Sequence, residues 1–275
     1  MKNILSIDVE EIFHTHLFKE KGKPVGREYR SPKILPSVFE MLEEYDAKAT
    51  FFVDGEIAEE HPGLINSIVY EGHEVAYHGW SHRTLWDIGE AEFKENLDRF
   101  LDLHPRCIGF RAPTFSLDNT TSWVLKHLEE RGLTYDSSIF PARTPLYGVP
   151  QAPIHPYLPM KDNVSRISCE DDSIMEYPLL IYQIMGIRLP AAGGFYLRLS
   201  PKLVNMALKK MNAEGHPGVI YLHTWELDRG LKKYNLGFIS SKITYHNIAK
   251  TPEYLRVLLR NFKFTSFSSY IKTQK

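Results

Sequence analysis

Short apolar runs alternate with helical patterns along most of the chain, and this alternation constrains the fold more than any other feature. The predicted strands are residues 4–7, 49–53, 74–77, 107–110, 133–135, 174–177 and 219–222. The predicted helices are residues 33–45, 56–70, 90–103, 119–130, 201–211 and 251–261. Strands that alternate with helices form parallel sheets, because each helix returns the chain to the edge where the next strand starts. We therefore predict an α/β fold, an irregular (β/α)7-type barrel.

A doubly wound open sheet is the alternative architecture. Its first strand is normally followed by a glycine-rich turn that binds phosphate, whereas here Asp8-Val9-Glu10-Glu11 follows the first strand. The composition is that of an ordinary globular protein, with 43% hydrophobic and 24% charged residues. We predict one domain over residues 1–275, with residues 228–275 as a carboxyl-terminal extension.

One stretch, residues 140–201, breaks the alternation. It holds nine of the seventeen prolines, and proline disfavours the interiors of helices and strands. A long ordered loop inside a compact domain is usually functional. We predict that residues 140–201 form a cap at the mouth of the barrel, with a mobile surface insertion as the alternative.

Charge, cysteine content and hydropathy exclude several classes of protein. The net charge of −1 gives no basic excess for nucleic acid, and the two cysteines, Cys107 and Cys169, exclude a disulfide framework. No apolar run approaches the ~18 residues of a membrane span. The amino terminus turns acidic at Asp8, too early for a signal peptide. These features predict a cytoplasmic protein and give no indication of its oligomeric state.

Polar residues follow nearly every predicted strand. Barrel enzymes place their chemistry at the carboxyl ends of the strands, and a scattered surface set would not gather at one end of each strand. The sequence therefore predicts an active site at this edge. The residues concerned are Asp8, Glu10, Asp54, His78, His82, Arg111, Asp136, His223, Trp225 and Glu226.

The spacing of His78 and His82 indicates a metal site. Four residues apart, the two imidazoles would share one face of a helical turn. A strand-end carboxylate is the expected third ligand, and Asp8 and Glu10 can both face the mouth because strand side chains alternate. Glu11 could replace Glu10 if the strand ends early. No cysteine pair is available to complete a structural zinc site, so an open catalytic site is favoured.

His223 and Arg111 complete the candidate site. A histidine at the end of an apolar strand can simply be a core residue, but the position of His223 opposite the metal pair favours a proton donor for a leaving amine. Arg111 could hold an aspartate by a bidentate pair; the alternative is a surface ion pair of little energetic value.

Four segments resemble the motifs of the NodB-type polysaccharide deacetylases, carbohydrate esterase family 4, and they occur in the family's order. They are residues 6–10, 78–82, 109–113 and 221–223. Residues 222–228 and the proline-rich stretch are most similar to the branch associated with exosortase and exopolysaccharide loci. The resemblance implies an irregular barrel of about seven strands, in agreement with the strand pattern.

The resemblance also implies a role for each catalytic residue. Asp8 matches the general base, Arg111 the arginine that steadies it, and His223 the general acid. Asp136 is a weak match to an aspartate that tunes the histidine in several members. The implied reaction hydrolyses an N-acetyl group and releases acetate and a free amino sugar.

One divalent metal ion, with zinc as the first choice, is the implied cofactor. His78 and His82 match the two histidine ligands. The family places its carboxylate ligand directly after the base, where this chain has Val9. Some relatives have an Asp-x-Asp arrangement instead, and Glu10 then becomes the predicted ligand.

An N-acetylated poly- or oligosaccharide is the implied substrate. Aromatic rings could provide flat faces for sugar rings, although for each aromatic residue core packing is the alternative. A small-molecule amidase with the same metal site and a non-catalytic carbohydrate-binding relative are the alternative functions. The substrate-binding candidates are Pro113, Trp80, Trp225, Asp136 and Tyr196.

Overall fold

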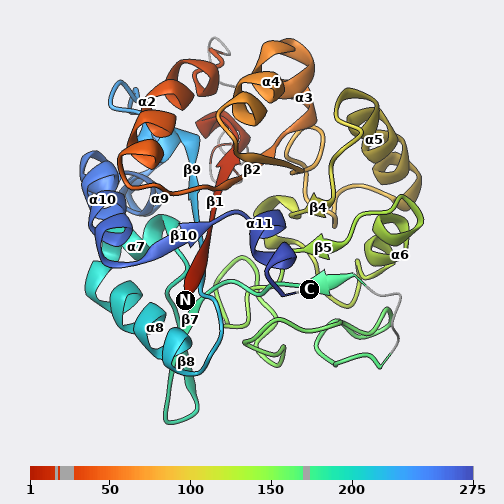
Figure 1. The fold of residues 1–275 in the computed structure, drawn as a ribbon. Helices are drawn as coiled ribbons and strands as arrows, with labels where there is room; N and C mark the ends of the chain where they lie inside the picture. The colour runs from red at the N-terminus through yellow and green to blue at the C-terminus, as the bar shows by residue number, and fades with distance from the viewer. Residues whose placement is uncertain (16–17, 19–27, 170–173, 275) are drawn as a thin grey trace.

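A curled parallel sheet organises the molecule, as a computed structural model of residues 1–15, 18, 28–169 and 174–274 shows (Figure 1). Within these residues the main sheet has eight strands, in the order β10-β1-β2-β3-β4-β5-β6, and β9 pairs with the other edge of β1. Every pairing in this sheet is parallel. The strands are β1 Lys2–Val9, β2 Thr50–Val53, β3 Glu74–Tyr77, β4 Gly109–Phe110, β5 Tyr135–Asp136, β6 Met175–Glu176, β9 Val219–His223 and β10 Lys263–Thr265.

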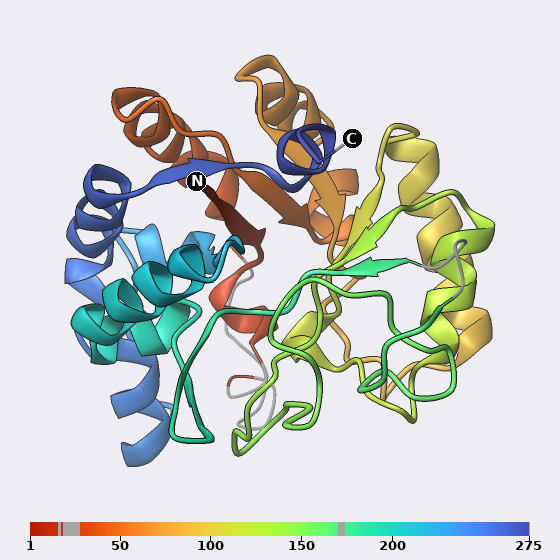
Figure 2. The same cartoon turned by 60° about the horizontal axis from the view of Figure 1, so that its bottom comes forward.

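Helices surround this sheet on its outer side, and the strands run through the middle (Figures 1 and 2). The long helices bury one apolar stripe; in α5, for example, Phe93, Leu97 and Phe100 are the buried residues. The α-helices are α2 Ser31–Glu44, α3 Gly55–Glu60, α4 Gly63–Tyr70, α5 Glu90–Leu103, α6 Trp123–Glu130, α7 Gly194–Leu199, α8 Pro201–Ala213, α9 Phe238–Tyr245, α10 Thr251–Asn261 and α11 Phe267–Lys272. Short 3-10 turns are η1 Ile12–His14, η2 Pro113–Phe115, η3 Thr224–Leu227 and η4 Ile248–Lys250.

Strand β1 lies at the centre of the sheet and is buried on both faces from Asn3 to Val9. It pairs with β2, β9 and β10, and the register sets Asp8 directly beside His223 of β9. A residue from each end of the chain is thus placed at the same point of the sheet edge.

The sheet curls without closing by strand pairing in the described part of the chain. The segment after β6 spans the gap, because Tyr177 N donates to the carbonyl of Asp136 (2.9 Å) and Leu180 N donates to the carbonyl of Val219 (3.1 Å). The predicted α/β fold, an irregular (β/α)7-type barrel, is confirmed in the form of a curled parallel half-barrel.

Residues 140–201 contain more regular structure than their proline content predicted. Strand β6 of the main sheet lies within them, as do α7 and an antiparallel hairpin of β7 (Ile181–Ile184) and β8 (Ile187–Pro190). The prolines fall at element ends, such as Pro190 at the end of β8 and Pro201 at the start of α8. A cap formed by this stretch, and the division of the chain into a domain with a 228–275 extension, remain predictions.

Two predicted helices depart most from the bounds in the structure. The single helix predicted over residues 56–70 is two helices, α3 and α4, because His61 precedes Pro62 and takes a non-helical conformation (φ −129°, ψ 72°). Helix α6 starts at Trp123, not at residue 119, since Asp118 caps a turn there by accepting the Thr120 amide (2.7 Å). No helix within the described ranges is long and apolar enough to cross a membrane.

Candidate active site

A cavity of about 160 Å³ lies at the carboxyl ends of β1, β3 and β9. Asp8, Glu10, His78, His82 and His223 all line it, so the structure brings the predicted catalytic and metal-binding residues together.

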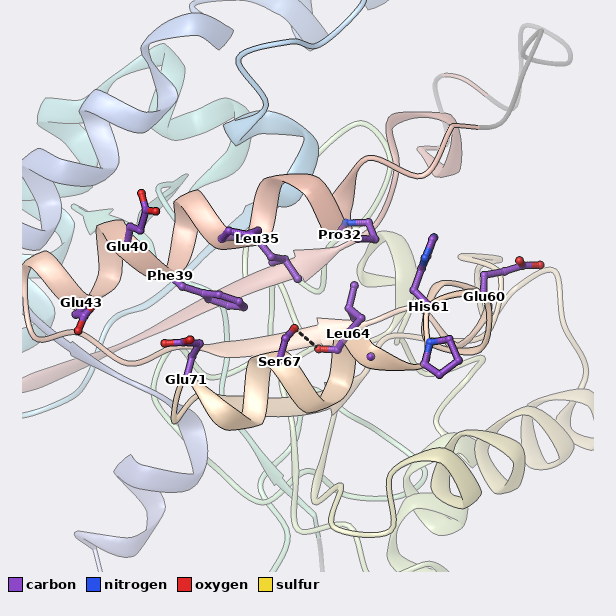
Figure 3. A pocket seen from close by; sticks show the side chains of 13 residues that line it. Pro32, Leu35, Phe39, Glu40, Glu43, Glu60, His61, Leu64, Ser67 and Glu71 are labelled. Atoms are coloured by element: carbon purple, nitrogen blue, oxygen red, sulfur yellow. Dashed lines mark hydrogen bonds between the residues drawn. The ribbon is translucent and has the colours of Figure 1, made fainter.

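A larger groove, of about 710 Å³, lies between α2 and α4. Figure 3 shows Leu35 and Phe39 facing Leu64 across it. The lining of the groove includes none of the predicted catalytic residues. Volume is therefore a poor guide to the site in this molecule, and the smaller cavity is the candidate.

Glu10, His78 and His82 form a buried cluster that could hold a metal ion. One ligand atom from each residue lies within 4.8 Å of the others. His78 Nδ1 lies 2.9 Å from the carbonyl oxygen of Arg111, and His82 Nδ1 lies 3.1 Å from that of His14. Both Nδ1–H groups therefore donate to carbonyls, which leaves the two Nε2 lone pairs for a metal. Burial lowers the pKa of His78 to about 4, so it is neutral, as a ligand must be.

The Glu10 carboxylate is ionised and only partly satisfied. Burial favours its neutral form, but the imidazoles of His82, His223 and His78 outweigh burial and hold the pKa of Glu10 well below its usual range. Trp225 Nε1 donates to Oε1 (2.9 Å), while Oε2 accepts no hydrogen bond from the described residues and lies in close contact with His82 Nε2. Two imidazoles and one carboxylate suit zinc and several other divalent transition metals.

Glu11, the alternative ligand, faces away from the cluster. Its Oε1 accepts hydrogen bonds from the amides of Arg30 (2.8 Å) and Ser31 (2.7 Å) at the start of α2. Strand β1 continues to Val9, which keeps Glu10 on the side of Asp8 and turns Glu11 outward.

The helical turn predicted for His78 and His82 is wrong. His78 directly follows β3, and no helix covers residues 78–82. Gly79 and His82 have positive φ values of 82° and 52°, so the loop folds back on itself and brings the ring centroids to 5.1 Å. Gly79 is required there because a Cβ would lie 2.7 Å from Pro113 Cγ.

Arg111 holds Asp8 through a single hydrogen bond. Its Nη1 donates to Asp8 Oδ1 (2.7 Å) and to Ser6 Oγ (2.7 Å), while Nε and Nη2 donate to the carbonyl and hydroxyl of Ser137, each at 2.9 Å. The expected bidentate pair is therefore absent between these two residues. Asp8 Oδ2 stays on the metal side, 3.9 Å from His78 Nε2.

His223 stands across the cavity with a carboxylate at each ring nitrogen. Nδ1 lies 2.9 Å from Glu226 Oε2, and Nε2 lies 3.7 Å from Glu10 Oε1. Burial opposes the charged imidazolium, but Glu10 and Glu226 outweigh burial and raise the pKa of His223 to about 9. Arg198 pairs with Glu226 (2.8 Å) and helps keep its pKa low against burial.

Glu226 and Arg198 are the site residues to which the sequence assigned no role. Glu226 is three residues after His223, in η3, and accepts the His223 amide as well as its ring (3.1 Å to the amide). That spacing is a local signal for the pair. No local sequence pattern links Arg198 to the site, because it lies 28 residues before Glu226 and meets it only in the folded chain.

Asp136, which was predicted to tune His223, does not line the cavity and does not contact that histidine. It is buried beside Glu176, and its Oδ1 accepts from Ser138 Oγ (2.6 Å). Burial raises the pKa of Glu176 well above its usual range, and Asp136 adds to this effect. Ser138 Oγ accepts the Ala112 amide (2.8 Å), so the carboxyl pair supports the loop that follows Arg111. Glu226, not Asp136, partners His223.

Of the other substrate-binding candidates, Trp225 lines the cavity, with its ring stacked on His223 at 5.2 Å between centroids. Trp80 packs on α5, under the guanidinium of Arg99 (3.9 Å). Three candidates are absent from the described lining of the cavity: Trp80, Pro113 and Tyr196. Tyr147 and Phe195, two other aromatic residues of the 140–201 stretch, do line it.

Solved structures share the half-barrel fold of this chain. A protein from Mycobacterium smegmatis assigned to the polysaccharide deacetylases superposes with a TM-score of 0.62 at 19% identity, over 98% of this chain and 88% of the other. The Puue allantoinase superposes with a TM-score of 0.57 at 15% identity, over 96% and 85%. At these identities the likeness concerns the fold alone.

Residues 25–133 match the family model "Polysaccharide deacetylase", and residues 137–272 match the model "Domain of unknown function (DUF3473)". The peptidoglycan-N-acetylglucosamine deacetylase of Bacillus cereus is 32% identical over 96 residues, covering 32% of this chain and 34% of the relative. The chitooligosaccharide deacetylase of Sinorhizobium fredii is 37% identical over 67 residues, covering 24% and 31%. The matched segment thus spans about a third of the length of these relatives.

Proposed function

We propose that this protein hydrolyses N-acetyl groups of an amino-sugar polysaccharide, using one divalent cation, with zinc as the first choice, held by Glu10, His78 and His82. The observation that carries the proposal is the convergence of this cluster with Asp8 and His223 on one cavity. The deacetylase names of the relatives supply the reaction, and the resemblance of residues 222–228 points to an exopolysaccharide as the polymer.

Asp8 is the general base in this proposal. Arg111 donates to Oδ1, so Oδ2 is the oxygen that takes the proton of the attacking water. A divalent cation in the cluster supplies Lewis acidity, which lowers the pKa of water toward about 7 and polarises the acetamide carbonyl.

His223 is the general acid. The oxygen of the attacking water bonds to the carbonyl carbon, the carbon–nitrogen bond breaks, and His223 gives its Nε2 proton to the departing amine. Glu226 fixes the ring through Nδ1 and favours its protonated form. The products are acetate and a free amino sugar.

The cavity favours a polymer over a small amide. Its volume, about 160 Å³, is below the ~300–1,000 Å³ of sites that enclose a whole small ligand. An acetamide group fits inside, while the sugar ring and its neighbours stay outside, next to Trp225 and Tyr147.

The test measures acetate release from a panel of N-acetylated oligosaccharides and small acylated amines, before and after removal of metal by a chelator. We expect release from the oligosaccharides, loss with the chelator and recovery with zinc. Asp8→Asn should lower the rate about 10²–10⁴-fold with metal still bound, and the exposed Asp102→Asn should be unaffected. Activity confined to small amides would establish the amidase, and saccharide binding without acetate release a non-catalytic relative.

A further inference from the structure

Residues 229–250 are strongly basic in a chain of net charge −1. They contain no Asp or Glu, and the five basic side chains are all exposed: Arg229, Lys232, Lys233, Lys242 and Lys250. Such local charge indicates an anionic partner.

The same segment exposes large apolar side chains. On α9, Phe238 is 77% and Ile239 72% exposed, and Ile243 is also exposed, whereas Thr244 is the one buried residue of this helix. Lys242 Nζ lies 4.6 Å from the centre of the Phe238 ring. Single exposed apolar residues are common on protein surfaces, but three on one short helix form a patch that indicates a partner.

The basic, apolar segment lies beside the active-site cavity. Ile243 and Thr244 line the cavity, and Arg198 donates to the carbonyl of Thr244 (2.8 Å) while also pairing with Glu226. In Figure 2, α9 projects at the lower left edge of the molecule, clear of the sheet. A partner on α9 would therefore lie next to the mouth of the cavity.

We propose that residues 229–250 dock on the surface of an anionic lipid bilayer. Lysines reach the headgroups while Phe238 and Ile239 enter the boundary of the acyl chains, as in interfacial helices. A polyanion would use the charges and leave the apolar face exposed. A second copy of the chain would set the same five cations against each other in a two-fold contact. The proposal stands independently of the hydrolytic function, and docking would bring the cavity to glycan held at a membrane surface.

The experiment sediments the full chain with vesicles of phosphatidylcholine alone or with phosphatidylglycerol added. We expect binding to the anionic vesicles only, weakening with salt. The triple change Lys232→Gln, Lys233→Gln and Lys242→Gln should weaken binding about 10²-fold, at about fivefold for each lysine. Phe238→Ser with Ile239→Ser should weaken it by at least about tenfold.

Tyr70→Ser is the matched control, because Tyr70 is 88% exposed on α4 and followed by Glu71; it should bind like the wild type. All variants should keep the wild-type melting temperature, since every changed side chain is exposed. The proposal is overturned if the wild type ignores anionic vesicles, if the Phe238–Ile239 variant binds normally, or if the patch instead mediates self-association in sedimentation velocity. Heparin binding that needs the lysines but not Phe238, without vesicle binding, would identify a polyanion partner and also overturn it.

Discussion

Arg111 Nη1 lies 2.7 Å from Asp8 Oδ1, and both side chains are buried at the centre of the half-barrel. The guanidinium also donates hydrogen bonds to Ser6 and Ser137. The Asp8 carboxylate is therefore paired directly with Arg111, which is itself held by Ser6 and Ser137.

Replacing this guanidinium should cost both stability and activity. Arg111→Met leaves the buried Asp8 carboxylate without its ion-pair partner, and we expect the free energy of unfolding to fall by about 3–5 kcal/mol. Arg111→Lys keeps a charge but cannot reach Ser6, Ser137 and Asp8 together, so a smaller loss is expected. Urea unfolding of the two variants provides the measurement; equal stability of Arg111→Met and wild type would contradict a compensating role.

Glu10 and Glu11 offer a matched pair for the metal ligand. Glu10→Gln removes the charged ligand, and we expect metal affinity to fall by more than about 100-fold, beyond the usual effect of residues that only support a ligand. Glu11→Gln should keep the metal and lose about 1 kcal/mol of stability, because the charge at the start of α2 disappears. Metal analysis after dialysis separates the two, and metal loss in Glu11→Gln alone would reverse the assignment.

Glu226→Gln tests the orientation of His223. The amide can still accept from Arg198 but no longer stabilises the charged imidazolium. A hydrogen bond to a charged group contributes about 1.5–3 kcal/mol, so we expect kcat to fall about 10–10²-fold with KM nearly unchanged. A change in KM alone would show that Glu226 acts on substrate binding.

Because of His73, we expect the free energy of unfolding to fall at acid pH; this residue lies outside the active-site cavity. Burial, with a smaller effect of Lys48, lowers its pKa to about 4, while an unfolded histidine titrates near pH 6.5. The folded state thus favours the neutral ring, and its contribution to stability is complete above pH 6.5 and is lost as the pH falls toward 4.

The measurement for His73 is the free energy of unfolding between pH 7 and 4, compared with His73→Asn. Asparagine can replace Nδ1 as acceptor of the Ala49 amide (3.3 Å) but does not titrate. We expect a flatter pH dependence in the variant, and parallel curves would show that His73 contributes nothing to it.

The strand-end residues could be predicted because their cause is local. Apolar runs such as Ile4 to Ile7 define the strands, and parallel strands place their carboxyl ends at one edge. Alternation along β1 then put Asp8 and Glu10 on one side, and the structure has them there.

What could not be predicted depends on contacts between distant segments. The loop of His78 and His82 is shaped by Gly79 against Pro113, which four-residue spacing does not reveal. Arg198 reaches Glu226 from a helix 28 residues away. Asp136 ends its strand as expected, but its partner is Glu176 of the neighbouring strand. It lies at the same end of the sheet as Asp8 and His223 and yet does not line the active-site cavity.

The pairing of β1 with three other strands has a consequence for the synthesis of the protein. Of its neighbours, β9 and β10 follow more than two hundred residues later, and contacts of such separation form slowly. A nascent chain would hold Asp8 and Glu10 on a strand with one unpaired edge until β9 leaves the ribosome. Asp8 and His223 therefore meet only after more than two hundred further residues have been synthesised, and the unpaired edge of β1 is open to aggregation until then.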